Sequence, residues 1–347
     1  MRMETLAACP ACGGAALEEL CPYNDLRYLL RGGGSRDLAR SDFVLCRRCG
    51  LMFARRRQTP AAFPEYYTRF AEWESRAYAV YPPPEAFIRG KVSAAVEIGR
   101  ILAKLDLLRP GGRVLHVRAD GGALMAHVRD HYGVTDIYGL DLFESNRRFA
   151  AAQYHLQNVA PLAYGDFRIP FESVTFDLII SNHLLMHACR PRDAFATLRQ
   201  RLTPGGAIFL YNEYDHARAF VERAPFLRDG INNFHKQLFS ADTLLTFLRL
   251  SGAEGQIVEA RNGSPLVVAR PAAPMTVSTL PARDFTRQVD MVRSWAAAYE
   301  RRWRWNLPRR LRRRYRVVDV VLAAVRRTER RLRGRADSVT SERPPRA

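Results

Sequence analysis

Short apolar runs alternate with amphipathic segments through the middle of the chain. Apolar residues recur at helical spacing over residues 84–108 and end at the turn Pro110-Gly111-Gly112. This alternation indicates βαβ units and hence a doubly wound, Rossmann-like α/β sheet, closed by an antiparallel pair at 256–260 and 265–269. The other predicted strands are 114–117, 137–140, 176–181 and 207–211, and the other predicted helices are 123–132, 145–156, 192–202 and 240–251.

Two C-x-x-C-G motifs precede this pattern, and 33 residues lie between Cys12 of the first motif and Cys46 of the second. Two intervening residues let one tight turn present two thiolates to the same tetrahedral ion, and the glycine lets the backbone curl around the sulfurs. Two such turns complete an all-cysteine shell without an open position. We therefore predict structural Zn²⁺ in residues 1–60, with a β-rich stretch between the motifs and a flexible tip at 31–35. The predicted ligands are Cys9, Cys12, Cys46 and Cys49.

Positive charge gathers at the other end of the chain. The net charge is +19, and only three of the 54 basic residues are lysines. Residues 283–347 hold 20 arginines, no lysine and 7 acids, a net charge of +13. Apolar residues at helical spacing, with tryptophans among the arginines, predict basic amphipathic helices over 283–334, and a disordered tail at 335–347. These helices could pack on the protein, bind an anionic membrane surface or, less favoured, bind nucleic acid.

No apolar run reaches the roughly 18 residues of a membrane-spanning helix. The first residues also lack the apolar core of a signal peptide. We therefore expect a cytoplasmic protein, with peripheral membrane contact through the tail as an option.

Several motifs follow one another in the order of a known family. Tyr138-Gly-Leu-Asp141 ends one predicted strand with an acid, Gly165-Asp166-Phe167 stands where the family's third strand would end, and Leu202-Thr-Pro-Gly-Gly-Ala207 is similar to the family's turn before its fifth strand. Over residues 84–270 this order resembles class I S-adenosylmethionine-dependent methyltransferases. Cys49-Gly-Leu-Met-Phe53 resembles the end of the zinc knuckle in a bacterial group of these enzymes. The resemblance implies a methyltransferase domain at 84–270 with S-adenosylmethionine as cofactor.

The resemblance also implies a cofactor site at the carboxyl ends of the strands. Asp141 would accept hydrogen bonds from the ribose hydroxyls, and Asp166 and Phe167 would contact the adenine. His187 and His235 are the candidate catalytic bases. The remaining candidate cofactor contacts are Asp120, Gly121, Gly122, Leu142 and Asn182.

One segment departs from the family pattern. The loop after the first strand is normally acid-x-Gly-x-Gly-x-Gly, because a Cβ atom there would collide with the cofactor. Here His116 replaces the acid, and Arg118 and Asp120 replace the first two glycines. Either Asp120 takes over the contact to the cofactor's ammonium, or cofactor binding has been weakened or lost.

We expect a methyltransferase whose acceptor is a saccharide, a glycolipid or another small metabolite, an expectation that rests on analogy. The alternative is a non-catalytic, methyltransferase-like scaffold that docks on an anionic membrane or polyanion through its tail. Nucleic-acid methylation is less favoured, because Ser181-Asn-His-Leu184 stands where an Asn/Asp-Pro-Pro-aromatic signature would be expected.

Overall fold

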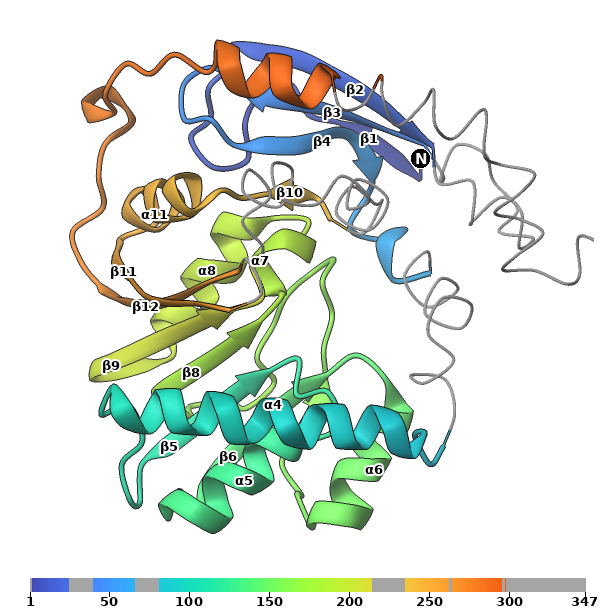
Figure 1. Ribbon diagram of the computed structural model, residues 1–347, viewed down its shortest axis with the longest axis vertical. Helices are drawn as coiled ribbons and strands as arrows, with labels where there is room; N and C mark the ends of the chain where they lie inside the picture. Colours follow the sequence, from blue (N-terminus) through green and yellow to red (C-terminus); the bar gives the residue numbers. More distant parts are fainter. Residues whose placement is uncertain are drawn as a thin grey trace, which may run out of the picture. The chain divides into compact units, whose positions relative to one another are not determined.

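The computed structural model describes residues 2–24, 40–65, 81–213, 235–261, 264–294 and 297. Residues 1–293 form one compact unit, and residues 294–347 are grouped in a second. The first unit contains two β-sheets, which we call the main sheet and the N-terminal sheet (Figure 1).

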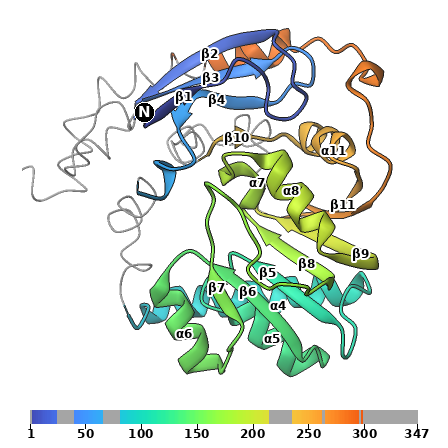
Figure 2. The same ribbon diagram turned by 180° about the vertical axis from the view of Figure 1, so that it is seen from behind.

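The main sheet has seven strands in the order β11-β12-β9-β8-β5-β6-β7 (Figure 2). The five strands from β9 to β7 are parallel, and β12 and β11 close the sheet as the predicted antiparallel pair. The chain winds outward from β5 to β7 and then returns to β8, so β5 and β8 flank the crevice where such folds bind ligands. The Rossmann-like prediction is confirmed. The strands are β5 (Arg113–Val117), β6 (Asp136–Asp141), β7 (Val159–Pro161), β8 (Phe176–Asn182), β9 (Leu202–Tyr211), β11 (Ala253–Arg261) and β12 (Ser264–Pro271).

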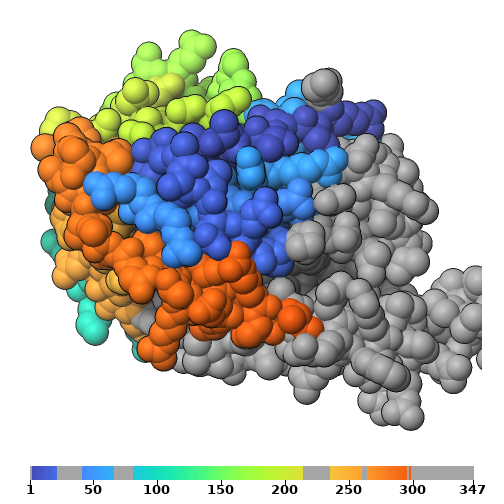
Figure 3. Space-filling model, turned by 90° about the horizontal axis from the view of Figure 1, so that it is seen from above, coloured from blue at the N-terminus to red at the C-terminus, as the bar shows by residue number. Residues whose placement is uncertain are grey.

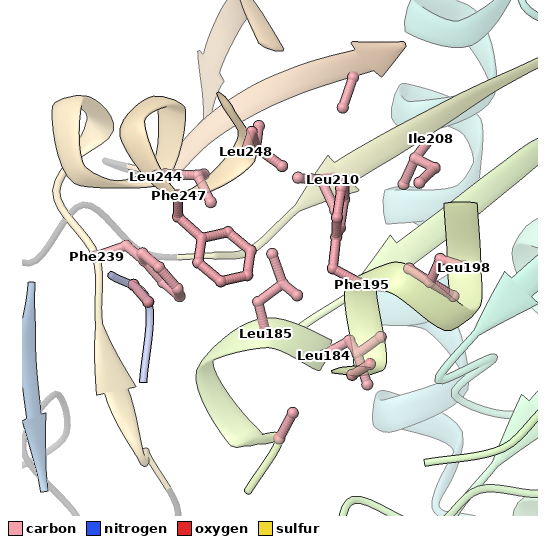
Figure 4. Close-up of a cluster of buried hydrophobic side chains, with 14 of the residues drawn as sticks. Leu184, Leu185, Phe195, Leu198, Ile208, Leu210, Phe239, Leu244, Phe247 and Leu248 are labelled. Atoms are coloured by element: carbon pink, nitrogen blue, oxygen red, sulfur yellow. The ribbon is translucent and has the colours of Figure 1, made fainter. Parts of the chain in front are cut away.

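Helices cover both faces of the main sheet, which explains why its central strands are almost continuously apolar. Val114 of β5 packs in the core under α4, α5 and α6, whereas its neighbour Leu115 packs in the core under α7, α8 and α11. Figure 4 shows the second core, where leucine and phenylalanine side chains of α8 and α11 meet β9. The helices are α4 (Glu85–Lys104), α5 (Ala123–Tyr132), α6 (Glu144–Tyr154), α7 (Leu184–His187), α8 (Pro191–Gln200) and α11 (Ala241–Leu250).

Two local predictions can be compared in detail. The helix predicted at 240–251 is α11, which is capped at its start by Ser240, whose side chain accepts from the Thr243 amide in a capping box, and Gly252 follows its end with φ +79°. The turn predicted at 202–207 falls at the irregular start of β9, where the register against β8 shifts between the pairs Leu202–Phe176 and Ala207–Leu178, and Gly205 adopts φ +79°. Residues 203–206, which include the Pro-Gly-Gly sequence, have no ladder partner in β8, so they interrupt the ladder before the regular part of the strand.

The N-terminal sheet has the order β1-β4-β3-β2, and a fifth strand from far along the chain completes it. Strand β10 pairs with β4, and the Ala54 amide donates to the Lys236 carbonyl at 2.9 Å. Strands β2 and β3 confirm the β-rich stretch expected between the cysteine pairs, while the tip predicted at 31–35 lies outside the described residues. The strands are β1 (Met3–Thr5), β2 (Leu17–Asn24), β3 (Arg40–Cys46), β4 (Met52–Gln58) and β10 (Gln237–Leu238).

The segment after β12 crosses back to the N-terminal sheet, as Figure 3 shows in orange against blue. After a 3₁₀ turn, η1 (Val277–Thr279), residues 286–294 are helical, and Phe285, Val289 and Val292 are buried. A Cβ on Gly50 would lie only 2.4 Å from the Phe285 ring, so this glycine makes room for the contact. The start of the predicted basic helices therefore packs on the protein.

Apart from residue 297, the chain beyond residue 294, including the helix predicted after Pro308 and the predicted tail 335–347, lies outside the described residues. In the described part of the chain, no helix combines the length and apolar character needed to cross a membrane.

Candidate functional site

The two cysteine turns fold alike. In each turn the glycine after the second cysteine donates its amide to the carbonyl of the first, Gly13 to Cys9 at 2.9 Å and Gly50 to Cys46 at 2.8 Å. Both glycines adopt the left-handed backbone conformation, with φ of +73° and +77°. The matching geometry explains why the glycine is repeated in the two motifs.

The four thiols of these turns converge at one point. Their sulfur atoms all lie within 4.8 Å of one another, all four residues are buried, and none forms a disulfide. The Cys9–Cys49 and Cys12–Cys46 sulfur pairs are 3.6 and 3.5 Å apart, close to the roughly 3.8 Å edge of a tetrahedron with Zn–S bonds of about 2.3 Å. Hydrogen bonds among the crowded thiols and burial raise the pKa of Cys9. A cation would relieve this crowding, so the cluster fits a metal ion.

The loop between β5 and α5 keeps a left-handed backbone although two expected glycines are missing. Arg118 has φ +61° and Asp120 has φ +49°, followed by Gly121 and Gly122 at +83° and +86°. A non-glycine residue in this conformation costs on the order of 1 kcal/mol or more. The fold therefore holds Arg118 and Asp120 in a left-handed backbone conformation that glycine adopts more easily.

Asp120 lies at the centre of a buried polar network at the end of β5. Its carboxylate is 2.5 Å from the Lys91 ammonium of α4, and it accepts a hydrogen bond from the Asn182 amide at 3.1 Å. The Arg118 guanidinium is 3.4 Å away. Burial works to raise the pKa of Asp120, but the charges of Lys91 and Arg118 lower it overall, so the carboxylate is ionised.

His116 stands on β5 where the family pattern has an acid. The ring is 2% exposed, and its Nε2 is 2.9 Å from the Tyr211 hydroxyl. Its Nδ1 has no hydrogen-bond partner among the described residues. Burial lowers the pKa of His116 from 6.5 to about 4, so the ring is neutral near pH 7.

Asp141 ends β6 and is 1% exposed. The Gly121 amide donates to its Oδ2 at 3.3 Å, the Phe143 amide donates to its Oδ1 at 3.0 Å, and the Asn146 side chain donates to both oxygens. Burial, with the nearby charge of Asp120, raises the pKa of Asp141 to about 6. Two hydrogen bonds therefore pair four predicted cofactor residues, Gly121 with Asp141 and Asn182 with Asp120, and the two pairs are joined because Asp120 and Gly121 are consecutive in the chain.

The other predicted cofactor residues have less distinctive surroundings. Gly122 is needed for packing, because a Cβ there would lie 2.7 Å from Leu156. Leu142 and Phe167 are half-buried against the core. Asp166 is exposed and pairs with Arg168 at 2.6 Å.

The two predicted catalytic histidines come together from distant parts of the chain. The ring centres of His187 and His235 are 5.0 Å apart, and those of His187 and Tyr164 are 5.1 Å apart. His183 is the third histidine of this cluster, with its ring centre 5.9 Å from that of His187. This histidine cluster lies after β8, beside the network around Asp120, to which Asn182 of the same strand belongs.

Sequence reasoning missed Glu213, which follows β9 and is fully buried. Its two carboxylate oxygens accept from the Leu185 amide at 2.9 Å and from the Met186 amide at 3.0 Å, and so hold the short helix that carries His187. Burial raises the pKa of Glu213 to about 7. The only hint in the sequence was an acid two residues after an apolar strand.

Comparison with known proteins identifies the main fold. Residues 118–210 match the model of a family described as a methyltransferase domain. The chain contains a methyltransferase domain. The match begins in the loop after β5 and ends in β9, so it spans Asp120, Asp141 and the first part of the histidine cluster. The recognition made from the motif order is confirmed.

Several solved structures are similar to the chain at low sequence identity. A complex of DhpI with SAH is 20% identical, with 62% of this chain and 95% of that chain covered and a TM-score of 0.40. DesVI of Streptomyces venezuelae is 16% identical, with 60% and 98% covered and a TM-score of 0.39. The methyltransferase in a complex with the Haloferax volcanii Trm112 activator is 17% identical, with 54% and 95% covered and a TM-score of 0.41.

Proposed function

We propose that the chain is an S-adenosylmethionine-dependent methyltransferase. The observation that carries the proposal is a pair of hydrogen bonds, Gly121 to Asp141 and Asn182 to Asp120, by which the loop after β5 contacts the carboxyl ends of β6 and β8 where the strand order reverses. Parallel strands bring their carboxyl ends to one edge, where such folds bind nucleotide cofactors. The match to the methyltransferase family supports the same function.

The residues of this crevice fit the chemistry of the cofactor. Asp141 offers two carboxylate oxygens to a pair of ribose hydroxyls, Asp120 offers a negative charge to an ammonium, and His116 offers a free ring nitrogen. Each acid now has internal partners, so binding requires that Asn146 release Asp141 and that Lys91 release Asp120. When bound, S-adenosylmethionine supplies a methyl group already activated by its sulfonium sulfur.

The protein's own contribution would be positioning and proton removal. His187 and His235 are the proposed bases, because they are 4% and 7% exposed and their rings lie 5.0 Å apart beside the crevice. Glu213 would position His187 through the helix amides that it binds. For the acceptor we propose a saccharide, a glycolipid or another small metabolite, by analogy with the bacterial group whose zinc knuckle this chain resembles.

For the cysteine cluster we propose one structural Zn²⁺. All four donors are thiols, and the shell is buried and closed, which suits a tetrahedral ion without a catalytic role.

A non-catalytic scaffold is the second candidate function. The observation that favours it is that all three acids assigned to the cofactor, Asp120, Asp141 and Asp166, already have partners within the protein. In a protein that no longer binds the cofactor, internal hydrogen bonds and ion pairs would be expected to replace the cofactor's contacts to these carboxylates.

Titration calorimetry with S-adenosylhomocysteine, the stable product of the cofactor, separates the two functions. We expect saturable binding by the wild type and a loss of at least tenfold in affinity for Asp141→Asn. The asparagine amide has only one acceptor oxygen, whereas the two ribose hydroxyls require two. The control is Asp130→Asn, an exposed acid on α5 that pairs with its neighbour Arg129. Absence of binding by folded wild-type protein at high micromolar ligand would reject the enzyme and leave the scaffold.

A further inference from the structure

The ion pair between Lys91 and Asp120 joins the first half of α4 to the loop after β5. The side chain of Lys91 is 28% exposed and that of Asp120 is 10% exposed, so both charges are partly withdrawn from water. A half-buried ion pair adds little to stability, because desolvation of the two charges offsets their attraction. Its contribution to folding therefore does not account for its presence.

The identity of the cation is informative in this chain. Only three of its 54 basic residues are lysines, so a lysine at position 91 is not the default choice of the composition. An arginine here would bind the carboxylate through two parallel hydrogen bonds. A lysine ammonium is a compact charge that exchanges partners more easily. Lys91 thus gives a pair that can open.

A buried group beside the pair has unused hydrogen-bonding capacity. His116 feels the charges of both Asp120 and Lys91, and its Nδ1 has no partner among the described residues. A buried polar atom without a partner is costly, and such atoms often mark a missing ligand. The three groups together offer a cation, an anion and a neutral hydrogen-bonding nitrogen.

We propose that Lys91 and Asp120 together bind the α-amino-acid end of the cofactor, with Asp120 receiving the ammonium and Lys91 receiving the carboxylate. The inference rests on the proposed function and adds Lys91 to its binding residues. A zwitterion complements an ion pair charge for charge, so the internal contact opens and two new contacts of opposite charge replace it. His116 is neutral, so it repels neither the ammonium nor the carboxylate of the ligand.

Two ligands that share the nucleoside test this assignment. S-adenosylhomocysteine carries the amino-acid end, and 5′-methylthioadenosine lacks it. We expect Lys91→Met to weaken S-adenosylhomocysteine binding at least tenfold in titration calorimetry, and to leave the affinity for methylthioadenosine within twofold of the wild type. Lys91→Arg should recover part of the loss. The control is Lys104→Met, an exposed lysine in the last turn of the same helix.

The possible results are distinct. If Lys91→Met binds S-adenosylhomocysteine as tightly as the wild type does, the inference is wrong and the proposed function stands. Tighter binding by Lys91→Met also overturns the inference, since Lys91 would then be an internal competitor of the ammonium. If neither protein binds either ligand while circular dichroism shows both folded, the proposed function itself fails. Folding is expected in the variant, because Asp120 keeps its contacts to Asn182 and Arg118.

Discussion

Arg57 joins the N-terminal sheet to the methyltransferase domain, and its removal should destabilise both. The side chain is 1% exposed and reaches three separate elements. Its guanidinium donates to Glu4 of β1 at 2.9 Å, to the Gln237 side chain of β10 at 3.3 Å, and to the Cys189 carbonyl after α7 at 2.5 Å. Arg57→Met keeps the length and apolar stem of the side chain but removes all three hydrogen bonds.

The expected loss of stability follows from the buried hydrogen-bond acceptors that Arg57→Met leaves unpaired. Hydrogen bonds to a charged group contribute about 1.5–3 kcal/mol each, and leaving one partner of a buried pair alone costs about 3–5 kcal/mol. Because the side chain of Glu4 is 22% exposed, water recovers part of its loss. We therefore expect Arg57→Met to lower the free energy of unfolding by about 3 kcal/mol, at the low end of that range. At about 2 °C per kcal/mol for a domain of this size, Tm should fall by about 6 °C.

The assay is thermal and urea denaturation at neutral pH, followed by circular dichroism. Arg55→Met is the matched control, because Arg55 lies on the same strand, its side chain is 39% exposed, and its contacts within the described part of the chain are a 3.8 Å ion pair and a long hydrogen bond; the substitution should cost less than about 1 kcal/mol. If Arg57→Met and Arg55→Met unfold within about 1 kcal/mol of each other, the reasoning about buried partners is refuted.

Four further predictions concern the metal, two buried charges and the tail. Elemental analysis should find zinc in the wild type and in Cys21→Ser but not in Cys46→Ser, and equal metal content in the two variants would argue against the cluster. Burial lowers the pKa of Lys236 from 10.5 to about 7, so the unfolded chain binds more protons between these values and stability should rise with pH across that window, a slope that Lys236→Met should lack. Burial raises the pKa of Glu213 from 4.5 to about 7, so stability should fall as pH rises through that window, and Glu213→Gln should flatten the curve. The full chain should sediment with anionic vesicles more than a chain ending at residue 294 does, and equal binding to neutral vesicles would contradict an electrostatic mechanism.

The sequence alone determined the parts that depend on local pattern. The alternation of apolar runs predicted six of the seven strands of the main sheet, all but the three-residue β7, since periodicity reports which side of an element is buried. The repeated glycine after each cysteine pair predicted two equivalent turns, because a left-handed backbone at that point is required by the turn itself. Local signals also mark both ends of α11, since Ser240 caps its start with a side-chain hydrogen bond and Gly252 follows its end in a left-handed conformation.

Only the tertiary structure decided which distant groups meet. Strand β10 joins the N-terminal sheet, and His235 beside it reaches His187, although about fifty residues separate the two histidines. Lys91 reaches Asp120 from a helix that precedes the sheet, and Glu213 reaches the amides of α7 from the end of another strand. Contacts of this kind depend on how elements pack in space, and no spacing along the chain encodes them.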